Sequence, residues 1–471
     1  MVWVEARVTP CAFSSVMVNR WQVTPVFYCG GLNNAMNTMA YGEILPQRSR
    51  RYLYKKVDYE NREGTIVMKT TIKPLFVAAN DQSLEELAWQ ALWENNTEKS
   101  ERYYREVLES RSFMKKIWPF GAELNTQMAF LYLRKEDFKE AAKYYGKAAG
   151  PWGFSFINDL SARQKQLEMF TNFQPYVISG KSIAKIDFIK SDPLPVIKAS
   201  IDGLPELNFI LDTGGEDIYL DDDMAKKMGI QIAGSAKVAK GFAAGSGSDI
   251  GYGKINKVKI GDIVVENIPV SISDMSNISE KVFSGFQIDG IIGTRFLMHF
   301  ISTIDYKNEK LILRRSTREN RKKFQDKLKN GKYKEIPFIL VATHLILADG
   351  SFNGKNTGKY FIDTGLAGAG ILSSEKRMED SGVKINWDDS ITGAGVGGDA
   401  EGLRVLIEEV ALGTGDNIIV KNNVPGVILK EELAMFDGQL GVDVSGLISH
   451  DFFKGSALTL DFETMLLIIE D

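Results

Sequence analysis

One tripeptide occurs twice in this chain, and it constrains the fold more than any other feature. Asp212-Thr213-Gly214 follows the apolar run 209–211, and Asp363-Thr364-Gly365 follows the apolar run 360–362. A buried strand that stops on Asp-Thr-Gly presents a carboxylate at a tight turn, where glycine lets a second backbone or a ligand approach closely. Two such turns brought face to face would hold two carboxylates at one site.

A second element follows each tripeptide and indicates an internal duplication. It reads Ile291-Ile292-Gly293 in the first copy and Leu447-Ile448-Ser449 in the second, and each is followed by a similar strand-like run, 303–306 and 459–462. These elements are 156 residues apart, and the two Asp-Thr-Gly turns are 151 apart. Matching order, spacing and chemistry predict two copies of one β-rich unit that differ by a few loop residues.

Composition excludes several classes of function. A length of 471 residues predicts more than one domain, and 44% hydrophobic with 25% charged residues is typical of a globular protein. The net charge of -4 argues against a nucleic-acid partner, and no apolar run is long enough to span a membrane. Cys11 and Cys29 cannot build a disulfide scaffold, and the three histidines lack metal-site spacing (His299, His344, His450).

Residues 1–80 are predicted to be an irregular lead-in of unclear role. Met1–Glu5 lacks the basic start and apolar core of a signal peptide, and the apolar run 74–79 after Met68 is too short for one. With no convincing signal peptide, the sequence leaves the location open between the cytoplasm and the cell envelope, including the periplasm.

Residues 81–178 are predicted to be a helical, repeat-like domain. Apolar residues recur at spacings of three and four (Leu84, Leu87, Ala88, Ala91, Leu92), and the stretches 92–96 and 133–137 are alike at an offset of 41 residues. The pattern resembles tetratricopeptide repeats, whose period is near 34, with an insertion around Trp118–Gly121. A plain bundle of helical hairpins is the alternative. Either form serves packing or contact with a protein partner.

Two β-rich domains are predicted over residues 179–313 and 336–471, joined by a basic linker, 314–335. Each contains a glycine-rich stretch that we interpret as a flap, a hairpin able to bend over a bound peptide. The flap glycines and their aromatic neighbour are Gly241, Phe242, Gly245 and Gly247 in the first domain and Gly393, Gly395 and Gly397 in the second.

The order of turn, glycine-rich stretch and apolar element resembles the retropepsin-like aspartic proteases, in the tandem bacterial form that follows a repeat-type helical region. The resemblance covers about 192–313 and 336–470. It implies a helical region followed by two all-β acid-protease domains in a pseudo-twofold, bilobal unit. It also implies that Asp212 and Asp363 are the catalytic pair, with Thr213, Thr364, Gly214 and Gly365 as the supporting turn residues. Ser449 replaces the expected glycine in the second copy.

The resemblance implies an aspartic endopeptidase that acts on polypeptides. One carboxylate takes a proton from a held water while the other donates a proton to the scissile carbonyl, and no metal or organic cofactor is required. Pepsin-like enzymes follow Asp-Thr-Gly with a hydroxyl residue, whereas Gly215 and Leu366 stand here. Without that donor the pair should keep its proton to higher pH, which predicts an optimum less acidic than pepsin's.

Two alternatives stay open at this stage. A non-catalytic module could use the same domains to grip a peptide while the helices dock a partner. An enzyme could instead pair the turns of two chains in a dimer. A monomer with the pair formed inside one chain is favoured, since one chain carries both turns. Asp217, Asp221, Asp222 and Asp223 lack the pattern of a calcium loop, so no metal site is predicted, and a helix start explains them better.

Overall fold

The computed structural model describes residues 2–5, 53–62, 65–74, 83–110, 121–150, 159–238, 248–329, 331–395, 398–429 and 442–470. The chain divides into two compact units, Met1–Leu87 and Ala88–Asp471. No helix among these residues is long and apolar enough to span a lipid bilayer.

The first unit contains strands within the lead-in that we predicted to be irregular. Strands β2 (Leu53–Arg62) and β3 (Thr65–Pro74) pair antiparallel along their whole length, and β1 (Val2–Glu5) adds to β3. For these ranges the prediction was wrong. The run Thr65-Ile66-Val67 and the later Thr70-Thr71-Ile72 are rich in β-branched residues, which favour strands.

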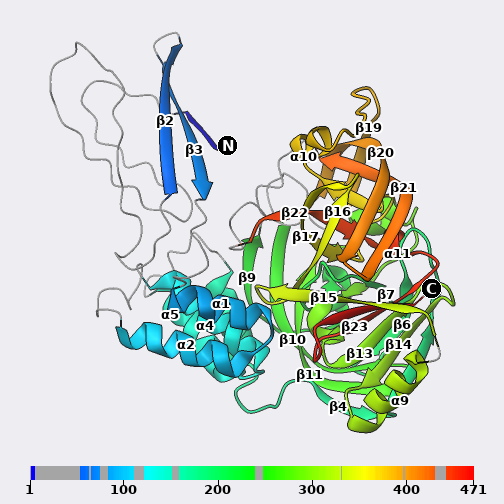
Figure 1. Cartoon of the computed structure of the whole chain (residues 1–471). Helices are drawn as coiled ribbons and strands as arrows, with labels where there is room; N and C mark the ends of the chain where they lie inside the picture. The colour runs from blue at the N-terminus through cyan, green and yellow to red at the C-terminus, as the bar shows by residue number, and fades with distance from the viewer. Residues whose placement is uncertain are drawn as a thin grey trace. The chain divides into compact units, whose positions relative to one another are not determined.

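The helical region consists of helix pairs related by the 41-residue offset seen in the sequence. Its helices are α1 (Leu84–Trp93), α2 (Thr97–Ser110), α4 (Ala122–Arg134), α5 (Phe138–Ala149) and α6 (Leu160–Glu168) (Figure 1). The turns inside the two pairs correspond, because Asn95 between α1 and α2 and Glu136 between α4 and α5 both adopt a left-handed backbone, with φ of 58° and 57°. Asp137 caps α5 by accepting a hydrogen bond from the Glu140 amide at 3.0 Å. Residues 118–120 of the predicted insertion lie outside the described residues.

The first Asp-Thr-Gly copy folds mainly as β-strands. Its elements are β4 (Val177–Gly180), β5 (Ile183–Asp187), β6 (Val196–Ile201), β7 (Leu207–Leu211), β8 (Ile218–Asp221), α7 (Asp222–Met228), β9 (Ile232–Val238), β10 (Ser248–Ile260), β11 (Ile263–Ser273), the π-helix η1 (Ile278–Val282), β12 (Gly290–Ile292), α8 (Thr294–Leu297), β13 (Phe300–Asp305) and β14 (Lys310–Arg315). Six of these strands form a row, β11-β8-β12-β7-β6-β10, which closes into a ring because β10 also pairs with β11.

The second copy repeats this arrangement. After helix α9 (Arg318–Leu328) come β15 (Tyr333–Val341), β16 (Leu345–Phe352), β17 (Lys355–Asp363), β18 (Ile371–Ser373), α10 (Glu375–Asp380), β19 (Ser390–Gly395), β20 (Gly398–Thr414), β21 (Asn417–Leu429), β22 (Val444–Ser449), α11 (His450–Phe453), β23 (Ala457–Asp461) and β24 (Leu466–Glu470). The row β21-β18-β22-β17-β16-β20 closes through β20 and β21, in the same strand order as the first ring.

The strands that lead into the two Asp-Thr-Gly turns are buried on both faces. Phe209, Ile210 and Leu211 of β7 are all buried, and so are Phe361 and Ile362 of β17. A strand buried on both faces shows a continuous apolar run instead of alternation. Each Asp-Thr-Gly turn therefore begins where its buried strand ends.

One antiparallel sheet joins the two copies in the order β5-β14-β13-β23-β24-β15. At its centre Thr303 on β13 pairs with Thr459 on β23, and their hydroxyls lie 2.7 Å apart. These residues are also 156 positions apart, which is the offset of the sequence repeat. Equivalent residues of the two copies therefore meet at a local twofold axis.

Candidate active site

The two Asp-Thr-Gly turns lie against each other and exchange hydrogen bonds. The Thr213 amide donates to Thr364 Oγ1 at 2.9 Å, and the Thr364 amide donates to Thr213 Oγ1 at 3.0 Å. Each hydroxyl in turn donates to the strand of the other copy, to Ile362 O at 2.7 Å and to Leu211 O at 3.0 Å. Both threonines are fully buried, and the two amides and two hydroxyls that make this contact are all hydrogen-bonded.

This contact brings the two carboxyl groups together. The Gly214 amide donates to Asp212 Oδ1 at 2.7 Å, and the Gly365 amide donates to Asp363 Oδ1 at 2.9 Å. A Cβ on Gly365 would lie 2.2 Å from Asp212 Cγ, and one on Gly214 would lie 2.8 Å from Asp363 Oδ1. Glycine is therefore required at both positions, because the carboxyl group of the opposite turn occupies that space.

The pKa values of the two carboxyl groups are displaced in the same direction. Burial raises the pKa of Asp363 well above its usual range, and the charge of Asp212 adds to this effect. Burial also raises the pKa of Asp212, although the Gly214 amide and a hydrogen bond from Asp363 oppose the rise. Two close carboxyl groups that both resist ionisation hold a shared proton, and they titrate as a pair.

The apolar element of the first copy supports the first turn. Ile291 and Ile292 on β12 pair in parallel with β7, and the Asp212 amide donates to Ile292 O at 3.1 Å. A Cβ on Gly293 would lie 2.3 Å from Asp217 O, so this position also requires glycine. The next residue, Thr294, donates its hydroxyl hydrogen to Thr213 O at 2.8 Å, and this hydrogen bond fixes the backbone of the first turn.

The corresponding element of the second copy has the same backbone with a different residue. Leu447 and Ile448 on β22 pair with Phe361 and Ile362. Ser449 has φ of -97° and ψ of 177°, against -90° and 178° at Gly293. Its hydroxyl donates to Ala369 O and accepts from the Asp451 amide at 3.2 Å. Ser449, which stands where glycine was expected, thus forms a hydrogen bond with the segment that follows the second turn.

The residues predicted to form the flaps lie in part outside the described residues. Strands β9 and β10 pair on either side of 239–247, which contains Gly241, Phe242, Gly245 and Gly247. Gly393 and Gly395 lie on β19, which pairs with β20, and Gly397 lies outside the described residues. Near the second tip, Asp399 accepts a hydrogen bond from Lys281 Nζ on η1 at 2.6 Å, so this hairpin contacts the first copy.

Charged residues directly after the first turn form a buried cluster that the sequence analysis missed. Asp217 is fully buried, and Arg163 Nη1 donates to its Oδ2 at 2.8 Å, while Arg163 Nη2 donates to Glu216. Arg295 Nη1 lies 3.5 Å from Asp217 Oδ1. Burial would raise the pKa of Glu216, but the Arg163 charge prevails and the pKa falls to about 2. Asp217 was expected to belong to a helix start, which is wrong: α7 begins five residues later.

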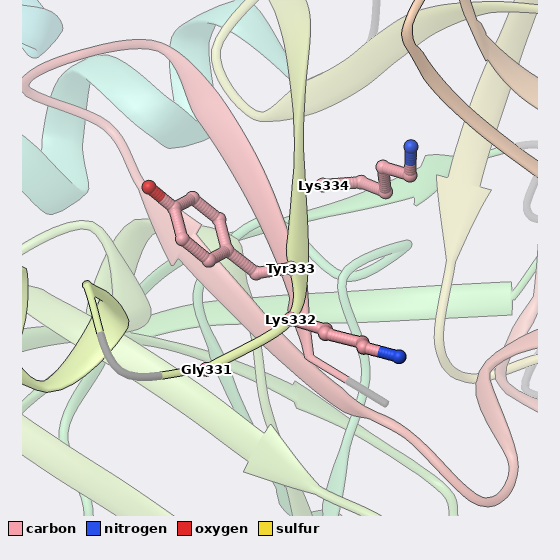
Figure 2. Close-up of a pocket in the computed structure, with 4 residues that line it drawn as sticks. All are labelled: Gly331, Lys332, Tyr333 and Lys334. Atoms are coloured by element: carbon pink, nitrogen blue, oxygen red, sulfur yellow. The ribbon is translucent and has the colours of Figure 1, made fainter.

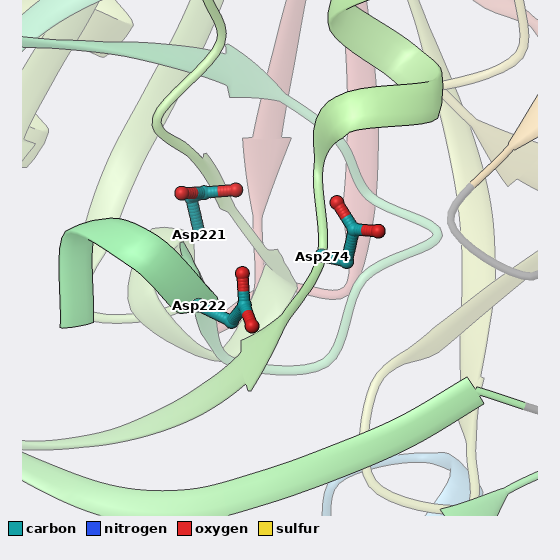
Figure 3. Close-up of side chains that lie close together, drawn as sticks. All are labelled: Asp221, Asp222 and Asp274. Atoms are coloured by element: carbon teal, nitrogen blue, oxygen red, sulfur yellow. The ribbon is translucent and has the colours of Figure 1, made fainter. Parts of the chain in front are cut away.

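A group of three carboxylates lies beside this region (Figure 3). Oxygens of Asp221, Asp222 and Asp274 lie within 4.8 Å of one another, a spacing that a metal ion could bridge. Asp221 already accepts from the Met224 amide and from the Met275 amide, each at 3.1 Å. The first of these contacts caps α7, so a structural role accounts for Asp221.

A hollow of about 320 Å³ is lined by Gly331, Lys332, Tyr333 and Lys334 at the start of β15. Figure 2 shows the two lysines on one side of the strand and Tyr333 on the other, as strand alternation requires. The hollow contains neither aspartate of the paired turns.

Comparison with known proteins points to the aspartic proteases. Residues 197–296 match the family model for aspartyl proteases, a range that includes Asp212 and Ile291–Gly293. No curated protein matches the chain. Among solved structures, the chain is similar to a retropepsin-like aspartic protease from Rickettsia conorii, with 22% identity over 29% of this chain and 93% of that one, at a TM-score of 0.22. The family match supports a peptidase of the aspartic type in general.

Proposed function

We propose that this protein is an aspartic endopeptidase of the retropepsin-like kind, with Asp212 and Asp363 as its catalytic pair. One observation carries the proposal: the reciprocal hydrogen bonds of Thr213 and Thr364 place two carboxyl groups of one chain side by side. The family match covers the first turn, and the second turn has the same strand order around it.

The arrangement suits hydrolysis by a water held between the two carboxyl groups. The ionised carboxylate takes a proton from the water, whose oxygen attacks the peptide carbonyl carbon, while the protonated carboxyl group donates to the carbonyl oxygen. In the second step the C–N bond breaks, and the leaving nitrogen receives the proton that the first carboxylate took from the water. The other carboxylate takes back a hydroxyl proton from the diol intermediate, which leaves a carboxylic acid product. The raised pKa values of both aspartates favour the singly protonated pair that this mechanism needs.

The substrate we propose is an extended polypeptide segment. The β9–β10 and β19–β20 hairpins serve as the flaps, since their strands offer backbone hydrogen bonds to an extended chain. Residues 179–313 and 336–471 act as the two lobes of a monomer, and the paired helices before them act as a tetratricopeptide-like region able to contact a protein partner.

The direct test is cleavage of casein by the wild type, Asp212→Asn and Asp363→Asn across acidic and neutral pH. We expect either substitution to lower the rate at least about a hundredfold, because each removes one of the two proton-transfer groups. Asp349→Asn is the matched control, since Asp349 pairs with Lys359 on neighbouring strands and should leave the rate unchanged.

Two outcomes would contradict the proposal. Cleavage that survives either catalytic substitution would assign that aspartate a structural role. A wild type that binds peptides but cleaves none would favour a binding module.

A further inference from the structure

Helix α6 carries polar residues on its buried face, which is unusual for a surface helix. Its buried residues are Leu160, Ala162, Arg163, Gln166 and Leu167. A buried guanidinium and a buried amide are costly unless every donor finds an acceptor. Both side chains reach the first Asp-Thr-Gly copy, where they meet two different parts of it.

Arg163 contacts the segment that leaves the first turn. It bridges Glu216 and Asp217, the fourth and fifth residues after Asp212, and its guanidinium lies 4.5 Å from the centre of the Tyr252 ring. The side chain of Arg163 is only 10% exposed and that of Asp217 is 0% exposed, so water screens this ion pair very little. Removing one partner of such a pair leaves the other charge buried and unpaired.

Gln166 and Ala162 contact the base of the first hairpin. Gln166 Nε2 donates to Gly253 O on β10 and to Val270 O on β11, both at 2.9 Å. Ala162 packs against Ala236, Ile250 and Tyr252 in one apolar cluster. A Cβ on Gly234 of β9 would lie 2.9 Å from Ala162 Cα, so helix and hairpin are in close contact.

In the part of the second copy that the structure describes, no equivalent of this contact lies at the turn. The residues that follow Asp363-Thr364-Gly365 are Leu366, Ala367 and Gly368, which carry no charge that an arginine could pair with. The neighbouring apolar cluster contains Leu366 instead, packed with Val341 and Leu347. The charged anchor is thus a property of the first turn alone.

We propose that helix α6 is a positioning element of the active site, in which Arg163 fixes the segment after the first catalytic turn and Gln166 fixes the base of the first flap. Because one rigid helix holds both, the helical region sets the position of the flap relative to the turn. The inference rests on the proteolytic function proposed above.

The test compares Arg163→Met, Arg163→Lys and Gln166→Met with the wild type on fluorescein-labelled casein. We expect Arg163→Met to lower kcat roughly ten- to a hundredfold with a smaller change in KM, because misplaced reacting groups lose rate more than binding. Arg163→Lys keeps the charge and should recover part of kcat. Arg321→Met is the matched control. Arg321 lies on helix α9, where its Nη1 pairs with Asp461 Oδ2 at 2.6 Å, away from the turn.

Hydrogen–deuterium exchange gives a readout that does not depend on cleavage. In Arg163→Met we expect faster exchange in both 212–221 and 248–260, and no such change in Arg321→Met. A kcat within twofold of the wild type, or exchange confined to α6, would overturn the proposal. If Arg163→Met does not fold, kcat and hydrogen–deuterium exchange of Arg163→Lys and Gln166→Met test the positioning role of α6 instead. A wild type without cleavage would count against the proteolytic function, whereas exchange would still decide the role of α6.

Discussion

At the scale of single residues, the carboxyl groups of the pair rely on backbone donors. Gly214 and Gly365 supply amides to Asp212 and Asp363, and the residues after these glycines have no hydroxyl to add. Hydrogen bonds to the ionised form lower a carboxyl pKa, so a missing donor leaves burial as the stronger influence. The raised pKa values of both groups agree with this account.

We predict a pH–rate profile whose maximum is less acidic than that of pepsin. The pair must stay singly protonated, and raised pKa values extend that state toward neutral pH. Casein cleavage measured across the pH range tests this directly, and a maximum confined to strongly acidic pH would contradict it.

The same pKa shift predicts how stability depends on pH. The pKa of Asp363 in the folded protein lies above the ordinary value of 3.8, so the protonated form stabilises the fold. That contribution is complete below 3.8 and is lost as the pH rises through the folded value. Asp363→Asn should therefore be more stable than the wild type at neutral pH, with the difference shrinking in acid. Urea unfolding at several pH values measures it.

The sequence predicted the two aspartates, threonines and glycines at the ends of buried strands, and the structure has them there. Arg163 and Gln166 could not be found in this way. Polar residues on a short amphipathic helix are expected to face the solvent. Their hydrogen-bond acceptors, such as Asp217 and Gly253 O, are far away in the sequence. Only the tertiary packing shows that these side chains are buried.

At the scale of elements, the supporting strands of the two copies show how duplicated segments diverge. Gly293 and Ser449 have nearly the same backbone angles, yet only the first is crowded by the backbone after its turn. The offset of 156 residues and the strand runs could be read from the sequence. The lead-in strands β2 and β3 were missed because their apolar alternation is weak, and local propensity was the only signal.

We predict that substitution at Gly293 costs more stability than substitution at Ser449. Gly293→Ser should destabilise the protein by about 2–4 kcal/mol, because its Cβ would lie 2.3 Å from Asp217 O. Ser449→Gly removes two hydrogen bonds and should cost about 1–2 kcal/mol. Thermal unfolding of both variants measures the difference, and equal losses would refute the steric explanation.

At the scale of the whole molecule, both halves of the candidate site come from one chain. Thr303 and Thr459 meet at the local twofold axis of the joining sheet, and Thr213 and Thr364 meet between the turns. The repeat in the sequence indicated the duplication. It could not show that the copies pair with each other, since two chains could exchange halves in the same way.

We predict that the specific activity stays constant on dilution. A catalytic pair formed within one chain needs no association step, whereas a pair shared between chains disappears as the dimer dissociates. Casein cleavage over a wide range of enzyme concentration, together with sedimentation, separates the two cases. A specific activity that falls on dilution would point to a dimer.

The charged anchor behind only one turn makes the two halves of the duplicated site unequal. Glu216 and Asp217, which pair with Arg163, follow the first turn, whereas Ala367 and Gly368 stand at the corresponding positions after the second. Buried charges therefore hold the first turn to helix α6, and the residues after the second turn pack in an apolar cluster. The same substitution made in the two turns should therefore not have the same effect.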